Sequence, residues 1–235
     1  MKIDEVRNGD AEFLMAYLYR KQVSDPAFFV RYTRDPKGRL EKLFWCDGIS
    51  RVNYSRFAHV LVLDTTYKTN KYGIPLVVLA GVNHHRRTVP FGCVLVVNEK
   101  EETFIWILEQ LIEAENGTRP IKSVIPDARH RLCLWHLMRN VMVNGGESFL
   151  ASFKKCIYRC RTPKYFDQAW NEVVEQHGEP DEKWAQDLYA DREKWSETFL
   201  RGQFFASTWS TQRCGSMHMT LKKVLKQKLT LYRLV

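Results

Sequence analysis

The residue with the clearest chemical potential in this sequence is Asp64, which directly follows the apolar run 59–63. A carboxylate at the end of a strand can bind Mg²⁺, because this ion prefers oxygen ligands. Enzymes that cut phosphodiester bonds often use two such ions about 4 Å apart, bridged by several carboxylates. An aspartate at a strand end also occurs in many α/β proteins. Asp64 alone therefore leaves the nature of the site open.

Cysteine and histidine offer a second kind of site. Cys133 and His136 have the spacing of zinc ligands, and Cys156 with Cys160 forms a second pair further along the chain. Three thiolates and one imidazole could hold a tetrahedral zinc ion. In the alternative, the cysteines pack as small apolar side chains. The second pair lacks the usual two-residue spacer, so we favour packing and expect no firmly bound cofactor.

Basic residues are concentrated in two segments of a chain whose net charge is +9. Residues 119–161 contain 9 basic and 2 acidic side chains, and residues 201–235 contain 7 basic and no acidic ones. Residues 162–200 are acidic, with 4 basic and 10 acidic side chains. The last segment is either a solvated helix face or a surface that binds DNA phosphates without reading the sequence. Its candidate contacts are Arg213, Lys222, Lys223, Lys226 and Lys228.

The composition is that of an ordinary globular protein, with 45% hydrophobic and 27% charged residues in 235. No run approaches the roughly 20 apolar residues that a membrane span needs, so we expect no membrane association. The first ten residues contain no apolar segment of the secretory type. Six cysteines are too few for a disulfide scaffold and indicate a reducing compartment.

The elements that must position these residues alternate between strands and helices. A helix is expected around residues 11–21, and the turn Asp35–Gly38 predicts a hairpin. A second helix follows Asn98, which has Glu101 in the capping-box position, and stops at Gly117. Strands are expected at 28–32, 40–46, 59–63, 75–82, 89–97, 121–125 and 129–135, and further helices at 136–142, 148–199 and 216–235. Three strands, a helix, a strand and further helices make up the element order of the ribonuclease-H-like fold.

Several longer sequence motifs indicate a family. These motifs are Phe44–Asp47, Leu63–Tyr72, Gly81–His85, Phe91–Cys93 and Arg129–His136. They resemble a Mutator-like (MULE) transposase domain, and their combination resembles the plant far-red impaired response (FAR) family. That resemblance runs from about residue 9 to the C-terminus. It implies a nuclear, DNA-associated regulator of transcription that descends from a transposase. It also implies zinc-binding domains on both sides of this region, and neither lies within these residues.

The departures from the family pattern concern its acidic residues. In the family, a segment with the second carboxylate follows the fourth strand, whereas here Ile125 runs directly into Pro126, Asp127 and Ala128. At the position of a plausible third acid the chain has Gly215. Asp64 is then the one acid that remains, so we expect the Mg²⁺ site and DNA cleavage to be lost. Parallel neighbouring strands also need a crossover of about a dozen residues, which this join is too short to provide.

We therefore expect an α/β fold: a degenerate ribonuclease-H-like transposase core that lacks the crossover between its fourth and fifth strands. Residues 1–50 would lead into this core, which comprises 51–147 and 201–235, and residues 148–200 would form an acidic helical insertion. The expected function is non-catalytic regulation of transcription in the nucleus, with non-specific DNA binding through the tail. Dimerisation with itself or with relatives is a further expectation. The alternatives are an active transposase or nuclease and a truncated interaction scaffold without a DNA function.

Overall fold

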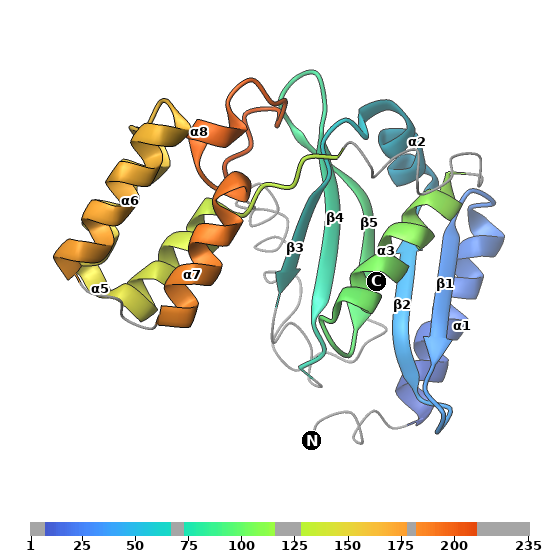
Figure 1. The fold of residues 1–235 in the computed structure, drawn as a ribbon. Helices are drawn as coiled ribbons and strands as arrows, with labels where there is room; N and C mark the ends of the chain where they lie inside the picture. Colours follow the sequence, from blue (N-terminus) through green and yellow to red (C-terminus); the bar gives the residue numbers. More distant parts are fainter. Residues whose placement is uncertain (1–7, 67–72, 116–127, 178–181, 211–235) are drawn as a thin grey trace. The chain divides into compact units, whose positions relative to one another are not determined.

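The computed structural model describes residues 8–66, 73–115, 128–177 and 182–210 (Figure 1). The chain divides into two compact units, Met1–Pro126 with Thr211–Val235, and Asp127–Ser210. We call them the sheet unit and the helical unit and describe each by itself. The helical unit begins at Asp127, whereas the expected insertion began at residue 148.

The sheet unit is built on five antiparallel strands in the order β1-β2-β5-β4-β3. The strands are β1 (Phe29–Arg34), β2 (Leu40–Cys46), β3 (Val62–Thr66), β4 (Leu76–Val82) and β5 (Thr88–Val96). The expected hairpin β1-β2 and the expected meander β3-β4-β5 are both confirmed. The pairing of β2 with β5 joins them into one sheet, and the chain is therefore a mixed α/β protein.

The turn of the first hairpin shows why its sequence predicts it. One carboxylate oxygen of Asp35 accepts hydrogen bonds from the backbone N–H groups of Lys37 and Arg39, both at 2.9 Å. Gly38 has a φ of +79°, a left-handed conformation that glycine adopts without steric cost. The side chain of Arg39 also donates to Asp35, at 2.7 Å. The turn thus satisfies its own polar groups.

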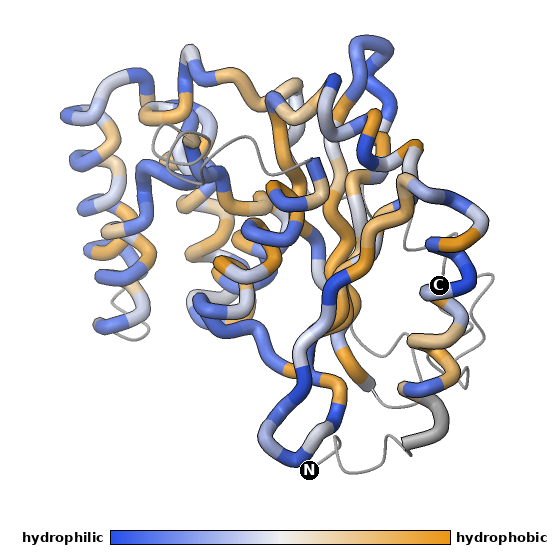
Figure 2. Tube along the Cα trace, turned by 90° about the vertical axis from the view of Figure 1, so that its right-hand side faces the viewer, coloured by the Kyte–Doolittle hydropathy of each residue, from blue (hydrophilic) through white to orange (hydrophobic). Residues whose placement is uncertain are grey.

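Helices cover both faces of the sheet. Helix α1 (Asn8–Ser24) buries Leu14 and Leu18 in one core together with strand residues such as Leu43 and Val78. Helices α2 (Gly48–Phe57) and α3 (Glu101–Ala114) contribute to the core on the other face. Successive strand residues point to opposite faces, so each strand supplies both cores. In Figure 2 the strands are largely orange, the colour of hydrophobic residues.

The second core depends on a close approach between two neighbouring strands. The fully buried ring of Phe91 on β5 lies over Gly81 on β4. A Cβ atom at Gly81 would come within 2.0 Å of the ring atom Cζ of Phe91. A glycine is therefore required there for steric reasons.

Two element boundaries differ from the expectation. Asp47 caps α2 by accepting from Ser50 N at 2.7 Å. Because this unexpected helix occupies the chain up to Phe57, β3 begins at Val62 rather than at residue 59, and Asp64 lies within the strand. The N-cap of α3 is Lys100 and not Asn98.

Asn98 still organises the start of α3, although not as its cap. Its side-chain oxygen accepts from Lys100 N at 3.2 Å and from the hydroxyl of Thr103 at 2.6 Å. The expected stop at Gly117 lies outside the described residues.

The helical unit holds the expected aromatic core. Its helices are α5 (Leu134–Tyr158), α6 (Pro163–His177), α7 (Glu182–Ala190), the 3-10 turn η2 (Asp191–Lys194) and α8 (Glu197–Leu200). Phe153, Trp170 and Trp195 are buried, and Phe149 and Phe166 join them in edge-on and tilted ring contacts. Among the expected core residues, Val174 and Trp184 are only partly buried. Helix α5 is broken at Gly146.

The expected strand at residues 129–135 is wrong. Residues 128–133 have no regular secondary structure, and α5 begins at Leu134. The backbone N–H of Leu132 donates to Lys194 O at 2.8 Å, and that of Leu134 donates to Trp209 O at 3.1 Å. These groups find their partners inside the helical unit and need no sheet neighbour. The strand expected at 121–125 and the helix expected at 216–235 lie outside the described residues.

No helix among the residues that the structure describes is both long enough and apolar enough to span a membrane.

Candidate functional site

Asp64 lies in the middle of β3, where it is half-buried and paired with Val78 of β4. Directly opposite residues of an antiparallel pair point to the same face, so Asp64 belongs to the face on which Val78 meets α1. The next residue on that face, Thr66, is buried and donates its hydroxyl to Leu76 O at 3.2 Å. Asp64 therefore lies on an edge strand whose residues all have partners on β4.

A metal centre needs several ligands in one place. Within residues 8–66, 73–115, 128–177 and 182–210, no three His, Cys, Asp or Glu side chains lie close enough together to hold a metal ion. Gly215, the position of a plausible third acid, lies outside these ranges, as does the join at 121–127. A two-metal site would require such a group of carboxylates in one place.

The four candidate zinc ligands lie in different environments. Cys156 and Cys160 are fully buried in the aromatic core, and their backbone carbonyls accept the hydroxyls of Ser196 and Thr198. Burial raises the pKa of Cys156 to about 12, so its thiolate is disfavoured. His136 is exposed, and its ring lies against that of Trp135. Cys156 and Cys160 thus pack among apolar side chains, and the expectation about zinc stays a prediction.

Arg131 is the most densely contacted charged residue of the string Arg129–His136. It forms an ion pair of 2.6 Å with Glu197, and the two side chains are 12% and 20% exposed. Its guanidinium carbon lies 4.3 Å from the ring centre of Trp209 and 5.3 Å from that of Phe205. This arrangement fastens residues 205–209 to the start of α5. Its role is structural, and sequence reasoning had assigned it none.

The surroundings of the neighbouring His130 favour its neutral form. Partial burial of the imidazole and, after it, the charge of Lys194 lower the pKa of His130, whereas Asp191 opposes them. Lys194 itself pairs with Asp191 at 2.6 Å. The basic tail candidates Arg213, Lys222, Lys223, Lys226 and Lys228 lie outside the described residues, so they remain a prediction.

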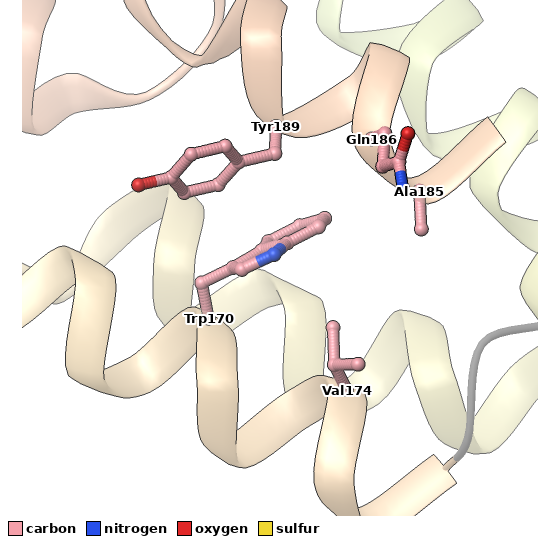
Figure 3. Close-up of a pocket in the computed structure, with 5 residues that line it drawn as sticks. All are labelled: Trp170, Val174, Ala185, Gln186 and Tyr189. Carbon is pink, nitrogen blue, oxygen red and sulfur yellow. The ribbon is translucent and has the colours of Figure 1, made fainter. Parts of the chain in front are cut away.

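A small cavity in the helical unit has the wrong lining for a catalytic site. It has a volume of about 150 Å³ and lies between α6 and α7 (Figure 3). The rings of Trp170 and Tyr189 face each other across it, beside Val174, Ala185 and Gln186. The hydroxyl of Tyr189 donates to Asp167, and this hydrogen bond raises its pKa. The lining offers no charged group, so we regard the cavity as a packing gap.

A larger hollow of about 440 Å³ lies in the sheet unit, where its lining includes Lys21, Asp25 and Asp47. Both carboxylates already have structural roles. Asp25 accepts from the backbone N–H of Gly48 at 3.0 Å, and Asp47 caps α2. Burial raises the pKa of the neighbouring Cys46 thiol to about 12. Neither of these carboxylates is therefore available as an acid or base, and the thiolate of Cys46 is disfavoured.

Comparison with known proteins identifies the family. The MULE transposase domain model matches residues 60–120, which include β3, β4, β5 and α3. Protein FAR-RED IMPAIRED RESPONSE 1 of Arabidopsis thaliana is 32% identical over 246 residues, covering 96% of this chain and 30% of that protein. Protein FAR1-RELATED SEQUENCE 4 of the same organism is 32% identical, with coverage of 88% and 31%. Protein FAR1-RELATED SEQUENCE 9, also from Arabidopsis thaliana, is 25% identical, with coverage of 99% and 46%.

The chain spans about a third of the length of the first two relatives. Two of the alignments, at 246 and 254 residues, are longer than the 235-residue chain. Those relatives therefore contain residues within the shared region that this chain lacks. No solved structure matches the chain significantly. The relatives match most of the chain, and the domain model matches residues 60–120 within it, so the chain is related to the far-red impaired response family and shares its MULE transposase domain match.

Proposed function

We propose that this chain is the core of a DNA-associated nuclear regulator of transcription that descends from a transposase and no longer cuts DNA. The observation that carries the proposal is the match to this family across a region that keeps Asp64 and departs from the family pattern where the second and third acids are expected. Among the described residues no group of carboxylates surrounds it, and the sequence has Gly215 where a third acid would stand. One carboxylate alone supplies too few ligands to hold two Mg²⁺ ions in place.

The fold that we propose for the core is a degenerate ribonuclease-H-like one. Three antiparallel strands in meander order, followed by a helix across the sheet, support it. Asp64 lies on the first strand of that meander, where the enzymes of this fold hold their first acid. The hairpin β1-β2 extends the sheet beyond β5, on the side away from Asp64.

The proposed partner is duplex DNA, contacted through the basic segment 201–235. Seven basic and no acidic residues favour phosphate contacts, which give affinity without sequence preference. Pairing with a second copy or with relatives of the same family is also part of the proposal. No cofactor bound by this chain is needed for such a role.

A cleavage assay tests the loss of catalysis. We expect supercoiled plasmid to remain intact when it is incubated with the purified chain and either Mg²⁺ or Mn²⁺. Nicking that disappears in Asp64→Ala would show that the active-transposase alternative is correct. Nicking that persists in Asp64→Ala would indicate a contaminating nuclease.

A binding assay tests the DNA partner. We expect weak, salt-sensitive binding that is similar for unrelated duplexes and is reduced when Lys222, Lys223, Lys226 and Lys228 are replaced by Glu. The same chain fused to a fluorescent protein should accumulate in nuclei of plant cells. Uniform distribution in the cell would contradict the nuclear part of the proposal.

A further inference from the structure

A second basic surface lies in the described part of the sheet unit, far from the tail in sequence. The turn between β4 and β5 contains His84, His85, Arg86 and Arg87, all of them exposed. The end of α2 adds Arg56 and His59, which are also exposed. We call these six residues the hairpin–helix surface.

The two parts of this surface lie side by side. The ring of Phe57, the last residue of α2, is 5.8 Å from that of His84, measured between ring centres. The rings of His84 and His85 are 4.0 Å apart. Figure 1 shows the end of α2 and the β4-β5 turn at the same end of the sheet. The β4-β5 turn and the end of α2 therefore meet at His84 and Phe57.

The turn holds its backbone in a fixed shape. The side-chain oxygen of Asn83 accepts from the backbone N–H groups of His85 at 3.0 Å and Arg87 at 2.9 Å. The backbone of Asn83 closes the same turn with Arg87 at 3.0 Å and with Arg86 at 2.9 Å. A preorganised turn loses little conformational entropy when its side chains bind a partner.

The sequence segments that contain the hairpin–helix surface have no acidic residues. Residues 48–63 and 82–98 contain no aspartate or glutamate. The other hairpin of the sheet differs in this respect, because Asp35 in its turn accepts from Arg39 at 2.7 Å. The β4-β5 turn thus has basic residues and no acidic ones, whereas in the β1-β2 turn Asp35 neutralises part of the positive charge.

We propose that the hairpin–helix surface binds the phosphate backbone of duplex DNA. This inference rests on the proposed association with DNA and assigns a contact on the folded sheet unit in addition to the tail. Arginine binds phosphate through a planar fork of donors, and histidine adds N–H donors. The polar turn offers no apolar side chain that could insert into a lipid layer, which favours DNA over a membrane.

The surface is separate from the remnant acid. Asp64 pairs with Val78, six positions before His84 on the same strand and turn. At about 3.3 Å per residue the separation along the strand is about 20 Å. A duplex could therefore rest on the hairpin–helix surface without approaching Asp64.

The test compares three variants of the full chain in a binding titration with a fluorescently labelled duplex of arbitrary sequence. The first variant, Arg56→Gln with Arg87→Gln, removes two charges from the hairpin–helix surface. The matched control, Arg34→Gln with Lys37→Gln, removes two exposed charges from the β1-β2 hairpin. The third is the tail variant, in which Lys222, Lys223, Lys226 and Lys228 become Glu. Circular dichroism and melting curves establish that each variant is folded.

We expect the first variant to bind roughly tenfold more weakly or worse, and its salt slope to fall by about 2 between about 50 and about 200 mM salt. The control should match the wild type. If the wild type binds and the first variant equals the control, the inference is wrong, while the proposed function stands. If the wild type does not bind at all, both the proposed DNA association and the inference that rests on it are wrong.

A labelled polyglutamate of matched charge provides the remaining comparison. We expect it to bind much more weakly than the duplex. Equal binding that is lost in the same variant would assign the surface to acidic protein segments and overturn the inference.

Discussion

Arg131 is held by partners of two kinds, one charged and the others aromatic. Glu197 pairs with it at 2.6 Å, and the rings of Trp209 and Phe205 lie against the guanidinium. Only 12% of the Arg131 side chain and 20% of the Glu197 side chain are exposed. A planar cation suits this environment, because it pairs through its edge and stacks through its faces. The energetic cost of losing it should therefore be large.

Replacing Arg131 with Ala should lower the free energy of unfolding by about 3 kcal/mol, because the mostly buried carboxylate of Glu197 loses its partner. Arg131→Lys keeps the charge and loses the stacking, so an intermediate loss is expected. The double variant Arg131→Met with Glu197→Leu should recover much of the stability. Urea denaturation followed by tryptophan fluorescence measures these differences.

Lys155→Met serves as the control, since Lys155 and Glu172 form an exposed pair. Its midpoint of unfolding should match the wild type. An Arg131→Ala midpoint equal to that of the control would show that the ion pair does not hold the helical unit together.

Buried thiols set an alkaline limit to stability. Burial raises the pKa values of Cys46 and Cys156 to about 12. Between about pH 8.5 and pH 12 the unfolded chain has released protons that the folded chain keeps. The free energy of unfolding should therefore fall as the pH rises through this window, by up to about 1.4 kcal/mol per pH unit for each thiol.

Urea titrations at a series of pH values from about 7 to about 10.5 measure this slope. Cys46→Ala and Cys156→Ala should each make the slope shallower. A slope that is identical in both variants and the wild type would assign the alkaline loss to other groups.

At the scale of elements, the break in α5 depends on one residue. Gly146 has a φ of +80° and a ψ of −179°, a backbone conformation that is essentially restricted to glycine. Gly146→Ala should therefore lower the free energy of unfolding by roughly 1–3 kcal/mol. Asn144→Ala, two residues earlier at an exposed helical position, should change it little. Thermal melts followed by circular dichroism compare the two, and equal melting temperatures would mean that the helix tolerates a straight path here.

Strong periodic patterns made several elements predictable from the sequence. The hairpin around Asp35–Gly38 and the meander through residues 75–97 combine apolar runs with turn residues, and both are confirmed. Helix α2 was missed because its apolar residues do not form one buried stripe, since Ile49 and Val52 are exposed, and because its cap, Asp47, gives only a local signal. Residues 129–135 resemble a strand by composition, but hydrogen bonds to Lys194 and Trp209 decide their conformation. Contacts of such long range leave no trace in local periodicity.

The candidate site was predictable only in part, for a similar reason. The type and position of Asp64 are visible in the sequence, and its strand is confirmed. The cluster formed by Arg56, Phe57 and the β4-β5 turn depends on helix α2, which the sequence did not reveal. The role of Arg131 depends on Glu197 and Trp209, more than sixty residues away.

At the scale of the whole molecule, the two units have separate hydrophobic cores. The helical unit has one core, built from residues between Leu132 and Phe199, whereas the other described cores consist of residues from the sheet unit. A fragment of residues 127–210 should therefore fold alone and melt cooperatively with a helical circular dichroism spectrum. A fragment of residues 148–210 lacks Leu137, Val141 and Arg131 and should melt gradually or not at all. Equal cooperativity in both fragments would place the boundary at residue 148.

In the helical unit, the start of α5 lies next to the last described residues of the unit. The backbone N–H of Leu134, at the start of α5, donates to Trp209 O near the last described residue, at 3.1 Å. Residues 135–208 can therefore be regarded as a long loop whose two ends are held together by this hydrogen bond. Growth or replacement of such a loop adds little closure entropy and leaves its attachment points unmoved. We therefore expect that the helical unit can be replaced as a module between these attachment points.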